Sequence, residues 1–172
     1  MLDSITNFDT RWFLRCNRYQ AVKPLTTFFK LVSRSGDGYF YALLGMLAVL
    51  TQTNNGVLFA SAGLIAFLIE IPSFILLKKL LKRERPFEKF NSCLCAIIPS
   101  DKFSMPSGHT AAAFLMASLI AHFYPDWSVL AYSWSTAISF SRVFLGVHFP
   151  TDLIVGAGLG TLCSFLSLSI LP

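Results

Sequence analysis

The chain has 172 residues, of which 54% are hydrophobic and only 13% are charged. Soluble domains carry about 25% charged residues, so this composition argues against an ordinary soluble protein. The net charge is +5, but the basic residues cluster at a few sites in an apolar chain, which argues against nucleic-acid binding and favours anionic lipid or a phosphorylated substrate. The length suits a single domain covering residues 1–172.

The segment before residue 37 is more polar than the rest of the chain. Phe8, Trp12 and Phe13 are interleaved with arginine residues, a pattern typical of an amphipathic helix in the membrane interface. Residues 21–35 contain three basic residues. We therefore interpret them as interfacial or half-inserted, with a sixth membrane span as the alternative.

Five later stretches approach the roughly 20 mostly apolar residues that a helix needs to cross a bilayer. They cover residues 38–52, 56–77, 109–124, 127–147 and 151–171. The predicted fold is an all-α integral membrane protein, a bundle of five to six transmembrane helices with an amphipathic N-terminal segment. With five spans, all 14 lysine and arginine residues fall on one face of the membrane, which the positive-inside rule would place in the cytoplasm.

The first segment with polar chemistry lies at the end of the second predicted span. Lys78, Lys82 and Arg85 are spaced to share one face of a helix, and Pro86 predicts that this helix ends at Arg85. Basic side chains at the end of a membrane helix commonly reach toward lipid headgroups, which is the simpler interpretation. The alternative is a cluster of cations that holds phosphate oxygens, in which Arg85 binds two oxygens at once.

The second segment, Pro106-Ser107-Gly108-His109, directly precedes an apolar helix. Ser107 is suited to cap this helix. The free N–H groups and the dipole of a helix start also attract anions, and Gly108 would let the backbone approach a ligand closely. His109 would then lie on the first turn, beside a bound anion. A capped helix with an incidental histidine is the alternative interpretation.

The third segment combines a cation, a histidine and a carboxylate. Arg142 lies near the end of the fourth predicted span, where an unpaired charge is costly, so it needs an anionic partner. Asp152 falls in the first turn of the last helix and can accept a hydrogen bond from Nδ1 of His148. This bond would fix the tautomer and leave Nε2 as a nucleophile. A surface histidine and a carboxylate favoured by the helix dipole are the alternative.

The connection before the third predicted span is the longest in the chain, at residues 87–105. Ile97 and Ile98 are among its apolar residues. We expect these side chains to dip into the membrane surface and to contact a lipid.

Together the three segments resemble the signature of the type-2 phosphatidic acid phosphatase superfamily, which includes membrane lipid phosphatases and vanadium haloperoxidases. All positions of the three family motifs are matched, by Lys78 and Arg85-Pro86, by Pro106-Ser107-Gly108-His109, and by Ser141-Arg142, His148 and Asp152. The motif core therefore covers residues 78–152 of the single membrane-embedded domain. The apolar stretches fit the membrane branch of the family and not a soluble haloperoxidase.

The resemblance implies a role for each motif residue. His148 would attack phosphorus and form a phosphohistidine, Asp152 would orient it, and His109 would protonate the leaving oxygen and then activate water. The phosphoryl oxygens would be held by Lys78, Arg85, Ser107, the N–H of Gly108, and Arg142. The resemblance implies no cofactor and no metal, because cations and N–H groups already neutralise the phosphate.

The predicted function is hydrolysis of a lipid-linked phosphate or pyrophosphate, with undecaprenyl pyrophosphate, phosphatidylglycerophosphate and phosphatidic acid as candidate substrates. A lipid phosphotransferase would use the same site, and a non-catalytic lipid-phosphate binder or transporter would tolerate loss of either histidine. The predicted partners are the lipid substrate and membrane lipids, without nucleic acid, and the sequence does not define an oligomeric state. The family implies a multi-pass protein of the inner cell membrane with an extracytoplasmic active site, against the count of basic residues.

Overall fold

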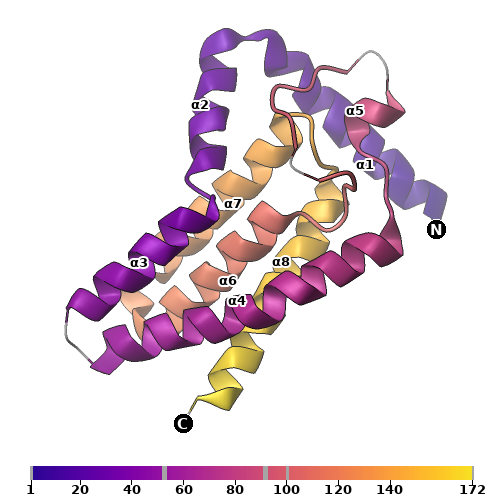
Figure 1. Cartoon of the computed structure of the whole chain (residues 1–172). Helices are drawn as coiled ribbons and strands as arrows, with labels where there is room; N and C mark the ends of the chain where they lie inside the picture. The colour runs from indigo at the N-terminus through magenta and orange to yellow at the C-terminus, as the bar shows by residue number, and fades with distance from the viewer. Residues whose placement is uncertain (1, 52–53, 91–92, 100, 172) are drawn as a thin grey trace.

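The computed structural model describes residues 2–51, 54–90, 93–99 and 101–171, and within these ranges the protein contains helices and no strands (Figure 1). The helices are α1 (Leu2–Asn17), α2 (Lys23–Arg34), α3 (Gly38–Leu50), α4 (Asn54–Leu81), α5 (Pro86–Lys89), α6 (Gly108–Phe123), α7 (Ser128–Phe144) and α8 (Pro150–Ile170). Short 3-10 helices precede α2 and α7. Each predicted span coincides with one helix to within a few residues, so the all-α class is confirmed.

α6 occupies the centre of the bundle and packs against α4, α7 and α8 (Figure 1). Leu115 and Leu119 on α6 are fully buried and belong to one apolar cluster with Phe59 of α4 and Ile138 of α7. Lipid is as apolar as leucine, so in a bilayer close packing, rather than removal of side chains from water, holds helices together. Packing in this central cluster holds α6 in position relative to α4 and α7.

α8 approaches α6 closely because glycines face the contact. A Cβ atom on Gly160 would lie 2.0 Å from the carbonyl oxygen of Ala111, and one on Gly156 would lie 2.6 Å from that of Ser107. Two small residues four positions apart form the pattern that lets membrane helices pack backbone to backbone. The contact sets the start of α8, which carries Asp152, beside the start of α6.

Among the described residues, two helices, α4 and α8, are long and apolar enough to cross a membrane. α3 and α6 are apolar too, but they have 13 and 16 residues, or about 20–24 Å at 1.5 Å per residue, less than a bilayer core of about 30 Å. Large apolar side chains on the outside of the bundle are exposed, including Leu68 on α4 and Phe165 on α8. Such a surface suits lipid better than water. The structure thus supports two spans, and the count of five to six stays a prediction.

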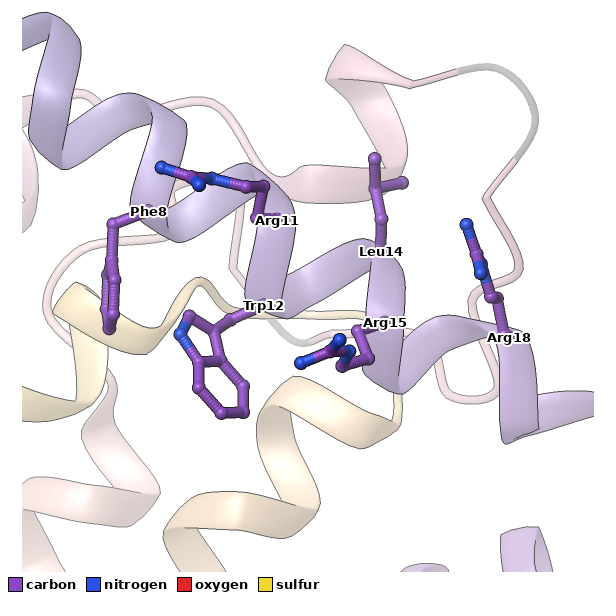
Figure 2. A pocket seen from close by; sticks show the side chains of 6 residues that line it. All are labelled: Phe8, Arg11, Trp12, Leu14, Arg15 and Arg18. Atoms are coloured by element: carbon purple, nitrogen blue, oxygen red, sulfur yellow. The ribbon is translucent and has the colours of Figure 1, made fainter.

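α1 lies across the end of the bundle from which α6 and α8 start (Figure 1). On its inner face Phe13 is fully buried and packs against the rings of Phe90 and Phe149. Its outer face mixes aromatic side chains with arginines around a cavity of about 500 Å³, and Phe8, Trp12 and Arg15 point to the same side of the helix (Figure 2). The cavity is lined by Phe8, Arg11, Trp12, Leu14, Arg15 and Arg18. α1 therefore has the two-sided character that its sequence pattern predicts.

The chain leaves α4 earlier than the sequence predicts. The helix ends at Leu81, and Lys82 has a φ of 45°, which a continuing helix does not allow. The expectation that Lys78, Lys82 and Arg85 share one helical face is therefore wrong. The irregular segment after Lys82 instead lets Arg83 and Arg85 reach partners in two other parts of the chain.

Candidate active site

Hydrogen bonds join the three motifs at one end of the bundle. Nη1 of Arg85 donates to the carbonyl oxygen of Val147 at 2.7 Å, so the first motif contacts the residue before His148. The N–H of Ser107 donates to the carbonyl oxygen of Asp152 at 3.1 Å, so the second and third motifs are also in direct contact. Segments far apart in the sequence therefore form one cluster.

The cations of the first motif converge on a carboxylate. Nζ of Lys78 and Nη2 of Arg85 lie 2.5 Å and 2.6 Å from the same oxygen, Oδ1 of Asp101. Burial raises the pKa of Asp101, but the hydrogen bonds and charges of Lys78 and Arg85 outweigh it and hold this pKa below its ordinary value. Two nearly buried cations thus point at one anionic oxygen, which is the arrangement that a phosphate oxygen requires.

Ser107 occupies the N-cap position of α6 but does not cap it with its side chain. Its hydroxyl accepts a hydrogen bond from the Thr110 hydroxyl at 3.1 Å instead. At Gly108 a Cβ atom would lie 3.0 Å from the ring of Phe74, so the absence of a side chain also serves packing here. The first N–H groups of any helix lack partners inside it, which leaves this helix start suited to an anion.

His148 and Asp152 face each other across 3.5 Å between Nδ1 and Oδ2. This is longer than a normal hydrogen bond, and Nδ1 has no hydrogen-bond partner within the described ranges. Catalytic hydrogen bonds are often this long without substrate. Burial lowers the pKa of His148 to about 4, against the opposing effect of the Asp152 carboxylate. The imidazole is therefore uncharged at neutral pH, as a nucleophile must be.

The Asp152 carboxylate is fully buried and held by groups from several elements. Its Oδ2 accepts hydrogen bonds from the N–H of Phe149 at 2.7 Å and from the hydroxyl of Ser104. Its Oδ1 accepts one from Nη1 of Arg83 at 2.6 Å. These contacts fix the oxygen that faces His148.

Arg83 connects this carboxylate to the N-terminal helix. Its Nη2 donates to Oδ2 of Asp9 at 2.5 Å, and its guanidinium lies 4.5 Å from the ring centroid of Phe149. Asp9 is fully buried and also accepts hydrogen bonds from the N–H and the hydroxyl of Thr151. One guanidinium therefore serves two buried carboxylates, one in α1 and one in α8.

His109 has a carboxylate partner of its own. Its Nε2 lies 2.9 Å from Oδ1 of Asp37, the N-cap residue of α3. An ionised carboxylate only accepts, so Nε2 carries the proton of this bond. Nδ1 has no partner among the described residues, which leaves it available for proton transfer.

Arg142 is 6% exposed and donates from Nη1 to the hydroxyl of Ser33 in α2. Its Nε lacks a hydrogen-bond partner in the part of the chain that the structure describes, and no described carboxylate lies within ion-pair distance of its guanidinium. The anionic partner that the sequence predicts for this buried cation is therefore not a described protein carboxylate. A buried guanidinium with an unused donor is a site where an anion would be stabilised.

A cavity of about 370 Å³ opens beside His109 and Arg142. Two other groups of residues line it, one from α2 and the turn after it and one from the connection before α6. They are Lys30, Ser33, Arg34 and Asp37, and Ile97, Ile98 and Pro99. Ile98 is 99% exposed, so the apolar side of the cavity is open to its surroundings.

Sequence reasoning found the motif residues and missed the side chains that hold them. Asp9, Ser33 and Asp37 lie in the N-terminal region, and no short spacing relates them to a motif. Asp9 carried one usable signal, because helical spacing places it on the same face as the apolar Phe13. Asp101 carried none, since a single carboxylate in a long connection is uninformative.

Comparisons with known proteins add an independent observation. The family model described as PAP2 superfamily matches residues 39–172. The undecaprenyl-diphosphatase of Sulfolobus acidocaldarius is 30% identical over 154 residues, which cover 88% of this chain and 73% of that protein. Phosphatidylglycerophosphatase B of Bacillus subtilis is 34% identical over 102 residues, which cover 53% of this chain and 49% of that protein. The crystal structure of Aquifex aeolicus LpxE is similar with a TM-score of 0.82 and 26% identity, covering 94% of each chain.

Proposed function

Since this chain belongs to the PAP2 superfamily, whose lipid phosphatases are hydrolases acting on lipid phosphates, we propose that it removes phosphate from a lipid through a phosphohistidine at His148. One observation carries the proposal. The uncharged imidazole of His148 faces a buried carboxylate, Asp152, which is itself held by three hydrogen bonds. This is the arrangement of a nucleophile and its orienting group.

In the first step Nε2 of His148 attacks phosphorus. The bond from phosphorus to the lipid oxygen breaks, and its electrons leave with the oxygen. His109, protonated on Nδ1 as well as on Nε2, donates the Nδ1 proton to that oxygen. Asp152 holds the proton-bearing Nδ1 of the nucleophile and stabilises the positive ring that forms. The cations and the helix start around the site stabilise the phosphoryl oxygens in the transition state. These groups are Lys78, Arg85, Ser107, the N–H of Gly108, and Arg142.

In the second step His109, which has given up its proton, takes one from water. The resulting hydroxide attacks phosphorus, the bond between Nε2 of His148 and phosphorus breaks, and inorganic phosphate forms. Both steps need positioning and charge stabilisation, which the residues described above supply. The protein residues return to their starting protonation states.

The substrate we propose is a membrane lipid phosphate or pyrophosphate, with undecaprenyl pyrophosphate, phosphatidylglycerophosphate and phosphatidic acid as candidates. Relatives named for the first two support this group. The exposed Ile98 and its neighbour Ile97 at the cavity suit contact with a lipid tail. We further propose a multi-pass protein of the inner cell membrane, with the active site on the extracytoplasmic face.

The test is phosphate release by purified protein in detergent from a panel of phospholipid and polyprenyl phosphates. His148→Ala should lower the rate by at least about 1,000-fold, because no nucleophile remains. His122→Ala is the matched control, since His122 is an exposed histidine in the last turn of α6 and lies outside the motifs. It should keep wild-type activity.

A covalent readout separates the mechanism from its rivals. Brief reaction with labelled substrate should leave acid-labile phosphate on wild-type protein and none on His148→Ala. Full activity of His148→Ala would refute the phosphohistidine. Label found in an acceptor lipid instead of free phosphate would identify a phosphotransferase.

A further inference from the structure

Two basic residues that belong to none of the three motifs line the cavity beside His109. Lys30 and Arg34 are four positions apart on α2, so they share one face of that helix. Ser33, between them in the sequence, donates the hydroxyl that contacts Arg142. The α2 surface that carries both cations is therefore attached directly to the motif core.

These cations differ from those of the first motif in having no protein partner. Lys78 and Arg85 are paired with Asp101, and Arg83 is paired with Asp9 and Asp152. No described residue forms an ion pair with Lys30 or Arg34. Both side chains are exposed at the cavity, so they can bind an anion there without first losing another contact.

The other charged groups around this cavity are those of the active site. Arg142 adds a third positive charge, and Asp37 adds one negative charge that is engaged by Nε2 of His109. Without counting the proton that His109 would donate, the charges of Lys30, Arg34, Arg142 and Asp37 sum to two positive units. The space therefore favours a multiply charged anion beside His109.

We infer that Lys30 and Arg34 form a second phosphate subsite, which binds the leaving phosphate of a lipid diphosphate. The inference rests on the proposed function, in which His109 acts at the leaving oxygen. Cations next to His109 then lie on the leaving-group side of the transferred phosphoryl group. When the substrate is a lipid monophosphate, the leaving group is a neutral alcohol, which these cations would not stabilise.

On a lipid diphosphate, the same two steps would transfer the terminal phosphoryl group. Nε2 of His148 bonds to the terminal phosphorus, and the bond from that phosphorus to the bridging oxygen breaks. The electrons of this bond leave with a lipid monophosphate, whose negative charge Lys30 and Arg34 stabilise. His109 then takes a proton from water, the hydroxide attacks phosphorus, and the bond from phosphorus to Nε2 of His148 breaks to release inorganic phosphate. The apolar Ile97, Ile98 and Pro99 line the same cavity and suit the first carbons of the tail.

The experiment compares two probes with the same tail, farnesyl diphosphate and farnesyl monophosphate, on full-length protein in a neutral detergent. Wild-type protein should prefer the diphosphate. The double variant Lys30→Gln/Arg34→Gln should lose about 10- to 100-fold in kcat/KM for the diphosphate and less than about threefold for the monophosphate. The double variant Lys30→Arg/Arg34→Lys, which keeps both charges, should retain most of the preference.

A matched control removes the same number of charges elsewhere. Arg18→Gln/Lys23→Gln changes two exposed cations at the junction of α1 and α2, and should leave both rates unchanged. Monophosphate hydrolysis reports whether each variant is folded.

Three results would overturn the inference. These are equal loss on both probes in Lys30→Gln/Arg34→Gln, no loss on either probe, or a wild-type preference for the monophosphate. In each of them the proposed phosphatase function stands. Wild-type protein that hydrolyses no lipid phosphate at all would instead refute the proposed function, and this inference with it.

Discussion

The N-terminal region, residues 2–37, and the motif core, residues 78–152, contribute to one site in different ways. The core holds the groups that would react, and their spacing can be recognised in the sequence. The N-terminal region holds no motif, and the family match begins only at residue 39. Yet it supplies a hydrogen-bonding partner to a side chain of each motif segment, through Asp9, Ser33 and Asp37. Several of the groups that hold the motif side chains in place therefore lie in a separate part of the chain.

The two regions also differ in how their charges are used. In the core, Lys78 and Arg85 are nearly buried and paired with Asp101. In the N-terminal region, Lys30 and Arg34 are exposed and have no ion-pair partner among the described residues. Buried ion pairs keep side chains in fixed positions, whereas exposed cations without an ion-pair partner are available to bind an anion. The comparison predicts graded effects, large for the core and smaller for its N-terminal partners.

The largest effect should come from Asp152→Asn in the core. Asparagine keeps the shape of the side chain but cannot stabilise the positive ring of His148, so kcat should fall by about 1,000- to 10,000-fold. The measurement is phosphate release under saturating lipid substrate, with the melting temperature of the detergent-solubilised protein as a check of folding.

The matched variant is Asp9→Asn, which changes the other carboxylate on Arg83. It should lower kcat only about 3- to 10-fold, because Arg83 keeps its contact with Asp152 and loses one anchor. Equal losses of kcat in Asp9→Asn and Asp152→Asn would contradict the distinction between the carboxylate that faces His148 and the one that only holds Arg83.

A separate prediction concerns pH and belongs to the core alone. The pKa of His148 is about 4, so the ring becomes protonated, and the nucleophile is lost, only as pH falls toward that value. At pH 5 about 90% of His148 stays unprotonated, compared with about 3% for an ordinary histidine of pKa about 6.5. Phosphoenzyme formation should therefore fall less than about twofold between pH 7 and pH 5, where an ordinary histidine would lose about 25-fold.

The burst phase with an aryl phosphate isolates this step, because its leaving group needs no proton from His109. Asp37→Asn serves as the control and should leave the pH dependence of the burst unchanged. A midpoint near 6.5 in wild-type protein would contradict the desolvated environment of His148.

A moderate effect is expected for Asp37→Asn on lipid substrates. The carboxylate orients His109 through Nε2 and favours its protonated form, so its loss should reduce kcat about 10-fold with an alkyl leaving group. The reduction should be less than about threefold with an aryl phosphate of similar charge. An equal loss on both would mean that Asp37 supports the fold of α3 rather than the acid.

Much of this architecture was predictable, for reasons that particular residues make clear. Apolar runs bounded by polar turns predicted α3, α4, α6, α7 and α8 closely, because membrane helices need long apolar stretches. The approach of Asp152 to His148 was predictable because a spacing of four residues at a helix start brings the two side chains together. Both signals depend on neighbours in the sequence.

What escaped prediction depends on contacts between distant segments. Thr151 and Asp9 are 142 residues apart, and their hydrogen bond exists only because α1 packs against α7 and α8. The end of α4 at Leu81 was missed for a related reason. Pro86 marks a helix boundary locally, but the chain leaves the helix earlier, and Arg83 and Arg85 have their partners in other elements.

The carboxylate of Asp101 has a consequence for how the site would exchange ligands. Lys78 and Arg85 are already paired with an oxygen of the same chain, so a phosphate that reached them would replace a tethered competitor. The net affinity for a phosphate would depend on how much more tightly it binds these cations than the Asp101 carboxylate does. A doubly charged phosphate with further contacts would therefore be favoured over small singly charged ions. Inorganic phosphate loses those further contacts once it is cut from the lipid and from His148. The returning side chain of Asp101 would then displace it, which couples turnover to release of the product.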